Sequence, residues 1–130
     1  MAASIQFDGA CRNNPGPAGI GYYIEIGSEE IEGKEYIGEC TNNEAEYKAL
    51  IASLEHAVEL ECADVVIEGD AELVVKQVTG DYSVNAENLQ PLHEKVMELK
   101  QEFESFHIYH QVREQNERAD SLANAALDED

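Results

Sequence analysis

Three segments in the first third of the chain have the pattern of β-strands, and in the first of them polar and apolar residues alternate as they do in a strand that is buried on one face. These segments are Ser4–Asp8, Ile20–Ile26 and Glu30–Glu39, and each predicts a β-strand. Between the first two, Gly9–Gly19 contains three Gly and two Pro, which predicts a loop. Gly27–Ser28 separates the second strand from the third and predicts a hairpin turn. We therefore expect the chain to begin with a three-stranded antiparallel meander.

An apolar stripe at helical spacing follows the third strand. Thr41 and Glu44 have the spacing of a capping box, in which each side chain bonds the backbone N–H of the other residue. The stripe has the i, i+3, i+4 spacing of an amphipathic helix and comprises Tyr47, Leu50, Ile51, Leu54, Ala57 and Val58. A second long helix is predicted by Asn88 as a cap with Pro91 in its first turn, and a final helix by Asn116 as a cap.

Two short segments in the second half of the chain complete the predicted sheet. Asp64–Glu68 is a short apolar run, which predicts a central, buried strand, and Phe106–Val112 predicts the last strand. After the first of these, Gly69–Asp70 opens a short helix that ends near Val78. The order of elements predicts the α/β class, with a five-stranded mixed sheet of three antiparallel and then two parallel strands, flanked by helices. At 130 residues the chain is long enough for one domain and too short for two.

The charge of the chain is extreme for a domain of this size. There are 8 Lys and Arg against 28 Asp and Glu, which gives a net charge of −20. We interpret this as adaptation to molar salt, where the Debye length falls to about 3 Å and repulsion between carboxylates is screened. An acidic partner-binding protein and a mimic of nucleic acid are the alternatives, because both would carry the same sign of charge.

Composition also limits the class of protein. Apolar residues make up 43% of the chain, which excludes a disordered acidic tail. No apolar run approaches the roughly 20 residues of a membrane span, and the first residues lack the pattern of a signal peptide. The cysteines, Cys11, Cys40 and Cys62, are odd in number and form no CxxC pair, so neither a disulfide framework nor a zinc site is expected. We therefore expect a protein of the reducing cytoplasm that makes no membrane contact.

Four acidic residues stand at positions where a sheet could gather a site. Asp8 ends the first predicted strand and Asp70 follows the fourth, while Glu46 and Asp120 lie near the starts of two helices. Side chains at the carboxyl ends of strands face the crevice in which open α/β sheets bind ligands. Each residue alone also fits a simpler role. Asp70 and Asp120 would suit a helix dipole as acids of the first turn, and Glu46 would suit a solvated surface.

The segments around these acids resemble the type 1 ribonuclease H family. They are Phe7–Cys11 with Asn14–Pro17, Thr41–Glu46, Ile67–Asp70 and Asn116–Ala123, and they occur in the family's order and at its spacing. The resemblance covers the chain from residue 4 to about residue 127. Because the chain has no basic insertion, it is most similar to the archaeal and related bacterial members.

This resemblance implies the ribonuclease H-like fold and endonucleolytic hydrolysis of the RNA strand of RNA–DNA hybrids, which leaves 5′-phosphate and 3′-hydroxyl ends. It maps the family's catalytic, metal-binding carboxylates onto Asp8, Glu46, Asp70 and Asp120 and implies two divalent ions, Mg²⁺ or Mn²⁺. The chemistry favours the same assignment. Two hard cations about 4 Å apart can acidify a water and stabilise the departing oxygen, and four carboxylates balance their charge.

The resemblance also implies residues that contact the hybrid. It maps them onto Asn14, Asn42 and Asn43, whose amides can bond 2′-hydroxyl groups without carrying charge. The alternatives are that Asn42 only supports the helix cap and Asn14 only forms a turn. Where several members have a catalytic His on a loop, this chain has Arg113, which cannot act as a base. We expect Arg113 to hold a phosphate or assist product release, with His110 as the alternative.

Two departures from the family concern affinity for the hybrid. Thr79–Glu87 contains neither Lys nor Arg where some members carry a basic insertion, and Glu72 stands where many have Gln. We therefore expect weak affinity, or a separate basic domain in a longer protein from which residues 1–130 form the catalytic domain. A monomer is expected. The alternatives to an active nuclease are a catalytically idle hybrid-binding module, against which all four carboxylates argue, and a nucleic-acid mimic, against which the four motifs argue.

Overall fold

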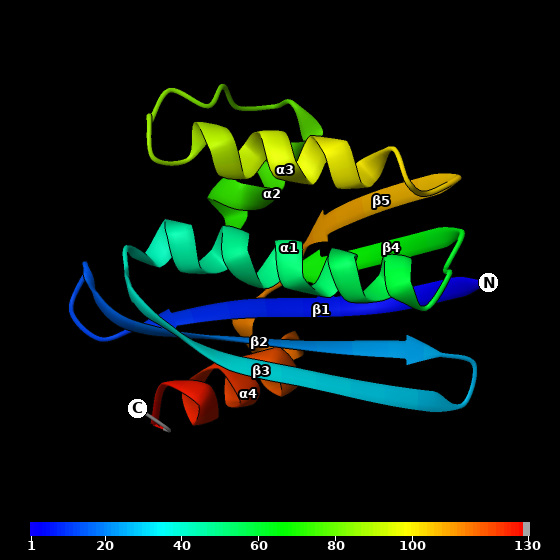
Figure 1. The fold of residues 1–130 in the computed structure, drawn as a ribbon, viewed down its shortest axis with the longest axis horizontal. Helices are drawn as coiled ribbons and strands as arrows, with labels where there is room; N and C mark the ends of the chain where they lie inside the picture. The colour runs from blue at the N-terminus through cyan, green and yellow to red at the C-terminus, as the bar shows by residue number, and fades with distance from the viewer. Residues whose placement is uncertain (129–130) are drawn as a thin grey trace.

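The computed structural model describes residues 1–128, which form one mixed sheet covered by helices (Figure 1). Its strands are β1 (Ala2–Cys11), β2 (Gly16–Ile26), β3 (Glu29–Cys40), β4 (Asp64–Gly69) and β5 (Ser105–His110). Over the described residues the sheet has five strands in the order β3-β2-β1-β4-β5. β1, β2 and β3 pair in antiparallel fashion, whereas β4 pairs in parallel with both β1 and β5. The predicted α/β class and the three-plus-two arrangement of the sheet are confirmed.

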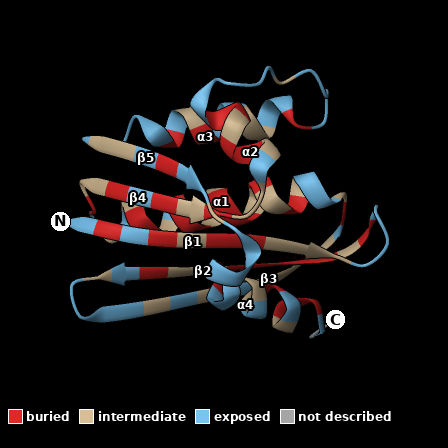
Figure 2. Ribbon diagram, turned by 180° about the vertical axis from the view of Figure 1, so that it is seen from behind, coloured by how far each residue is buried: buried red, intermediate tan, exposed pale blue. Residues whose placement is uncertain are grey.

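The helices divide between the two faces of the sheet. They are α1 (Asn42–Glu59), α2 (Glu72–Thr79), α3 (Gln90–Lys100) and α4 (Glu117–Asp128), with a 3-10 turn η1 (Arg113–Gln115) before the last. α1 packs on one face across β1 and β2, and α4 packs on the opposite face across β1, β2 and β3 (Figures 1 and 2). α3 packs against α1, and α2 against β5. Because the two helices cover opposite faces of the sheet, β1 lies between α1 and α4.

The main core lies between the sheet and α1. Phe7 and Ile67 from the sheet and Tyr47 and Leu50 from α1 are fully buried, as is Val96 of α3. The stripe predicted from sequence is buried as expected, with Ile51 and Val58 at its half-buried margin. Burial of apolar surface contributes about 25 cal/mol per Å², so this layer supplies most of the energy that holds α1 on the sheet.

α4 approaches the other face of the sheet closely because small residues meet there. A Cβ atom on Gly21 would lie 2.4 Å from the backbone nitrogen of Ala123, so a larger residue would force the helix away from β2. Ala119, Ala123 and Ala126 form the buried side of the helix. This contact fixes the height of α4 above the sheet.

The predicted loop Gly9–Gly19 is wrong in its extent. β1 continues to Cys11 and β2 begins at Gly16, and Cys11 pairs with Ala18 across the two strands. Only residues 12–15 form the connection, which the Arg12 N–H closes by donating to the carbonyl of Pro17 (2.9 Å). The prediction fails because Gly9 and Gly19 lie within the strands, where they let α1 and α4 approach the sheet closely, and only Gly16 packs against the connection itself.

The fourth and fifth strands also depart from the prediction. β4 is an inner strand, but only Val65, Ile67 and Gly69 on one face are buried, and Val66 is 40% exposed. The reason is that α4 covers β1, β2 and β3 and leaves this part of the sheet open (Figure 2). β5 ends at His110 rather than at Val112, because the chain leaves the sheet there and enters η1.

Two of the predicted helix caps are wrong. α3 begins after Leu89 without a side-chain cap, and Asn88 instead bonds the Glu44 carboxylate. Asn116 precedes α4, but its Nδ2 donates to the carbonyl of Phe7 (2.9 Å) rather than its oxygen accepting from the helix. In both cases the Asn side chain bonds a residue far away in sequence and not the helix end that the local pattern predicts.

Residues 1–128 contain no helix that is both long and apolar enough to cross a membrane. The three cysteines are free thiols, of which Cys40 and Cys62 are buried and Cys11 is half-buried. Within the described part of the chain no disulfide contributes to the fold, so packing and hydrogen bonding hold it together.

Candidate active site

Three of the four candidate carboxylates meet at one end of the sheet. One oxygen from each of Asp8, Glu46 and Asp70 lies within 4.8 Å of the others. Phe7 of β1 pairs with Gly69 of β4 in the parallel ladder, so the residues that follow them, Asp8 and Asp70, come side by side. Asp70 precedes α2 rather than lying within it, and its side chain is therefore free of the helix.

Glu46 reaches this group through a close contact between β1 and α1. A Cβ atom on Gly9 would lie 2.4 Å from the backbone carbon of Ala45, so glycine is required for α1 to lie at this depth. The Gly9 N–H donates to Oε1 of Glu46. The predicted capping box is present: Thr41 Oγ1 accepts from the Glu44 N–H (3.2 Å), and the Glu44 carboxylate accepts from the Thr41 N–H (2.8 Å). The cap sets where α1 begins, and hence where Glu46 points.

Asp120 lies beside the group of three rather than inside it. Its side chain hydrogen-bonds Asp8, which joins the first turn of α4 to β1. Oδ1 of Asp120 lies 3.8 Å from Nη1 of Arg113 and 3.3 Å from Nδ2 of Asn124. The structure thus brings all four predicted carboxylates to the same end of the sheet, from four separate elements.

Burial and neighbouring negative charge raise the pKa values of Asp8 and Glu46. Asp8 is only 2% exposed, and burial first, then the charge of Glu46, raise its pKa far above the ordinary value. Burial raises the pKa of Glu46 to about 7, against the opposing effect of the hydrogen bond from the Gly9 N–H. The site therefore favours added positive charge, either protons or cations.

The donor set fits a hard divalent cation. Oδ2 of Asp70 is buried and accepts no hydrogen bond among the described residues, and the guanidinium of Arg113 beside it is exposed, with Nε 3.6 Å away. A buried carboxylate oxygen without a hydrogen bond can bind a metal ion. Carboxylate oxygens are the ligands that Mg²⁺ and Mn²⁺ prefer. Asp8, Glu46 and Asp70 could hold one such ion, with Asp120 next to Asp8 as a ligand for another.

Arg113 lies over the acidic group, whereas His110 lies at its margin. The guanidinium of Arg113 is exposed and places Nε 3.6 Å from Oδ2 of Asp70 and Nη1 3.8 Å from Oδ1 of Asp120. His110 is the last residue of β5 and pairs with Gly69 in the ladder. Of the two residues left open by the sequence, Arg113 is the one that contacts the carboxylates in this structure.

The three predicted substrate residues lie near the amino-terminal end of α1 and are exposed. Oδ1 of Asn14 accepts from the backbone N–H of Asn42 (2.9 Å), which ties the β1–β2 connection to the helix. Asn42 lines a cavity of about 380 Å³ together with Glu46, Arg113 and Asp120. Asn43, on the first turn of α1, does not line it. A larger cavity, of about 680 Å³, is lined by α4, η1 and Gln6 of β1 but by none of the four carboxylates.

Several contacts that hold the site together cannot be predicted from the sequence. The Gly9 N–H on Glu46 and the Asn116 side chain on β1 depend on tertiary packing, and no local pattern marks them. Asn124 is different, because it follows Asp120 by four residues on a helix. That spacing places two side chains on the same face, and it is a signal that the sequence does contain.

Comparison with known proteins agrees with this geometry. Residues 6–126 match the family described as reverse transcriptase-like. The chain is 46% identical to ribonuclease HI of Halobacterium salinarum over 125 residues, which is 95% of this chain and 63% of that protein. The crystal structure of RNase H1 from that organism superposes with a TM-score of 0.96 at 43% identity over the full length of both chains.

Two further proteins extend the comparison. Ribonuclease H of Halorhodospira halophila is 35% identical over 136 residues, covering 94% of this chain and 90% of that protein. LC11-RNase H1, solved in complex with an RNA/DNA hybrid, superposes with a TM-score of 0.91 at 40% identity and covers 98% of this chain and 97% of that one. Four acidic residues lie at the end of a β3-β2-β1-β4-β5 sheet, and the relatives match nearly the whole length of the chain. The chain belongs to the ribonuclease HI family.

Proposed function

We propose that this chain is a metal-dependent endoribonuclease that hydrolyses the RNA strand of RNA–DNA hybrids. The observation that carries the proposal is the meeting of Asp8, Glu46 and Asp70 within 4.8 Å, with Asp120 bonded to Asp8. A group of four acids at one site is costly to assemble, because burial and neighbouring negative charge raise the pKa values of Asp8 and Glu46, and cation binding offsets that cost. The relative LC11-RNase H1, bound to an RNA/DNA hybrid, supports the choice of substrate.

The four carboxylates would hold two ions, Mg²⁺ or Mn²⁺. When bound, such ions supply a water of lowered pKa and stabilise charge on the phosphate and the departing 3′ oxygen, which leaves 5′-phosphate and 3′-hydroxyl ends. Asp8 and Asp70 provide ligands from neighbouring strands of a rigid sheet. Gly9 keeps the carboxylate of Glu46 in place through its N–H, so that little reorganisation is needed at the moment of reaction.

Arg113 and the three Asn residues would bind the substrate. The exposed guanidinium of Arg113 already lies beside Asp70 and Asp120, where a scissile phosphate would approach, and it can donate two parallel hydrogen bonds to phosphate oxygens. Asn14, Asn42 and Asn43 are exposed at the end of α1 and can bond 2′-hydroxyl groups, the feature that distinguishes RNA from DNA. Contacts through neutral amides would suit a chain with a net charge of −20.

We further propose that residues 1–130 act as a single catalytic domain and as a monomer in the reducing cytoplasm. All four carboxylates come from one chain, so the site needs no second copy, and the three free thiols suit a reducing compartment. The chain spans 63% of the length of the Halobacterium relative.

Cleavage of a labelled hybrid with Mg²⁺ or Mn²⁺ at molar KCl tests the proposed function. We expect cleavage of the RNA strand only, and a loss of about 10³-fold in turnover, or about 4 kcal/mol, for Asp70→Asn. The matched control is Glu98→Gln, an exposed acid on α3 outside the carboxylate group, which should retain turnover. Binding of the hybrid without cleavage by the wild type would favour the idle module, and neither binding nor cleavage would favour the nucleic-acid mimic.

A further inference from the structure

Asn124 has no role in the mechanism above, yet it is bonded to one of the four carboxylates. It lies one turn after Asp120 in α4, and both residues line the cavity that contains Glu46. Its Nδ2 donates to the backbone carbonyl of Asp120 (2.9 Å) and to Oδ1 of the same residue (3.3 Å). The reverse orientation of the amide would set its oxygen against two other oxygens, so chemistry fixes which atom faces Asp120.

Asn124 does not stabilise the helix in which it lies. The residue is exposed in the middle of α4, where Asn is a poorer helix former than Ala. A side chain that bonds the carbonyl four residues earlier competes with the regular helix and slightly destabilises it. The double contact with Asp120 is therefore better explained by the site than by the stability of α4.

Asp120 is held less firmly by burial than Asp8 or Asp70. Asp8 is buried, and Glu46 is held by the Gly9 N–H, whereas the side chain of Asp120 is 28% exposed and lies outside the group of three. Besides Asn124, the donor near its Oδ1 is Arg113 at 3.8 Å, on an exposed side chain that would move to meet a phosphate. Asn124, by contrast, is anchored to the same helix as Asp120.

We propose that Asn124 is a positioning residue, which holds the Asp120 carboxylate beside Asp8 and thereby sets the affinity of the weaker of two divalent-ion positions. The inference rests on the proposed function, because it assigns Asp120 to metal binding. It predicts that loss of the amide affects one ion position and leaves the position formed by Asp8, Glu46 and Asp70 intact. Partners that orient a metal ligand typically change metal affinity by about 10- to 100-fold, and one exposed hydrogen bond should lie at the lower end.

Calorimetric titration of the protein alone with MnCl₂ at constant molar KCl measures both ion positions without substrate. For Asn124→Ala we expect the weaker dissociation constant to rise about 10-fold and the tighter one to stay within about 2-fold. Asn124→Gln keeps an amide donor and should recover part of the loss. The control, Ser121→Ala, changes an exposed residue of the same helix and should match the wild type in both constants.

Two further readouts separate positioning from a structural role. The thermal midpoint of metal-free Asn124→Ala should equal or exceed that of the wild type, because Ala is the better helix former. In the wild type, the side-chain ¹⁵N–¹H₂ signals of Asn124 should shift with the weaker Mg²⁺-binding event. In hybrid cleavage, Asn124→Ala should require about 10-fold more Mg²⁺ for half-maximal rate, with a smaller loss at saturating metal.

An unchanged weaker constant in Asn124→Ala would overturn the proposal, as would an equal weakening of both constants together with a lower thermal midpoint. A single Mn²⁺ site in the wild type would overturn it as well. Absence of hybrid cleavage by the wild type would instead overturn the proposed function, and the MnCl₂ titration would still decide the role of Asn124.

Discussion

The surroundings of Glu46 shift its pKa into a range that pH titration can reach. Burial raises its pKa from 4.5 to about 7, so in the metal-free protein the folded state holds the proton more tightly than the unfolded chain does. Protonation of Glu46 therefore stabilises the fold fully below pH 4.5, and this contribution is lost as pH rises through about 7. Asp8, whose pKa is also raised, acts in the same direction.

We therefore expect the thermal midpoint of the metal-free protein to fall by several degrees as pH rises from about 4.5 to about 8. The measurement is thermal unfolding with a chelator at molar KCl, which screens the general charge of the chain. Glu46→Gln should show a smaller fall, because its side chain has no proton to lose. Parallel curves for the two proteins would contradict the assigned environment of Glu46.

Arg113 and His110 can be separated by their effects on turnover. Arg113 contacts Asp70 and Asp120 through its guanidinium. Arg113→Ala should lower turnover by about 10- to 100-fold, or about 1.4 to 2.7 kcal/mol, and Arg113→Lys should recover only part because it lacks the bidentate fork. Both should be assayed at saturating metal and equal salt.

His110→Ala serves as the comparison for Arg113→Ala. If His110 carried a proton in the reaction, the pH–rate profile of His110→Ala would lose an inflection that the wild-type profile shows. We expect the profile to keep its shape. A large defect in His110→Ala beside a silent Arg113→Ala would contradict the preference for Arg113.

At the scale of elements, the contact between β1 and α1 decides the geometry of the site. Gly9 is the point of closest approach, and an added Cβ atom would overlap the backbone of Ala45 and Glu46. Gly9→Ala should therefore destabilise the protein by about 2–4 kcal/mol, lower the thermal midpoint by about 10 °C and reduce turnover by moving Glu46.

Gly27→Ala is the matched control for Gly9→Ala. Gly27 has a φ of +59° and open space around it, so Ala there costs only backbone strain, about 1 kcal/mol. Unfolding and hybrid cleavage of both variants should be measured under the same salt. Equal effects of the two substitutions would contradict the close approach of α1 to β1.

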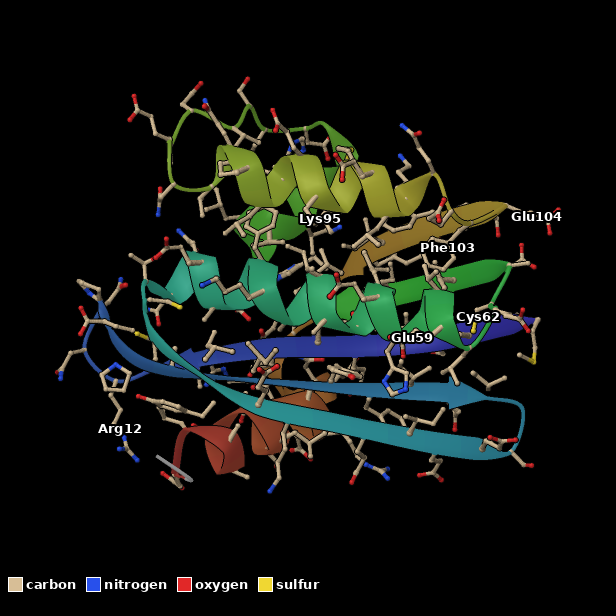
Figure 3. All side chains as sticks on the ribbon, viewed as in Figure 1. Arg12, Glu59, Cys62, Lys95, Phe103 and Glu104 are labelled. Carbon is tan, nitrogen blue, oxygen red and sulfur yellow. The ribbon has the colours of Figure 1, made fainter. Side chains whose placement is uncertain are left out.

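For the whole molecule, the charge of −20 sets the conditions of stability. Each of the three Arg residues forms an ion pair with a carboxylate of the same chain: Arg113 with Asp70, Arg118 with Glu30 at 2.7 Å, and Arg12 with Asp128 at 2.6 Å. Figure 3 labels Arg12, which lies near the last turn of α4. The short pairs occupy Arg12 and Arg118 internally, which leaves Arg113 and the neutral amides to recognise the hybrid.

We expect the thermal midpoint and the turnover to rise together from about 0.2 to about 3 M KCl, because salt screens the repulsion among the acids. Thermal unfolding across this series should show a rise of about 10 °C or more. A variant with Glu98, Glu102 and Glu104 changed to Gln removes three exposed charges far from the site and should depend less on salt. A flat series for the wild type would contradict adaptation to salt.

The order of elements, the capping box at Thr41, the apolar stripe of α1 and the four acidic positions all follow from the sequence. The elements and the cap depend on neighbours within one turn or one strand, so local chemistry determines them. The motifs around the acids supply the family resemblance, and with it the set of four. How those carboxylates meet does not follow from any one segment, because they come from four elements.

Only the tertiary structure decides the contacts between distant segments. The sequence predicts that Gly9 is part of a loop, but it lies in β1, where the absence of a side chain lets α1 pack closely against the strand. Asn116 reads as a cap but donates to Phe7, more than a hundred residues away in sequence. Asp120 bonds Asp8 of β1, which is far away in sequence. The physical reason is that a polar group bonds the partner that packing brings nearest. The sequence shows which groups are candidates but not the distances between them.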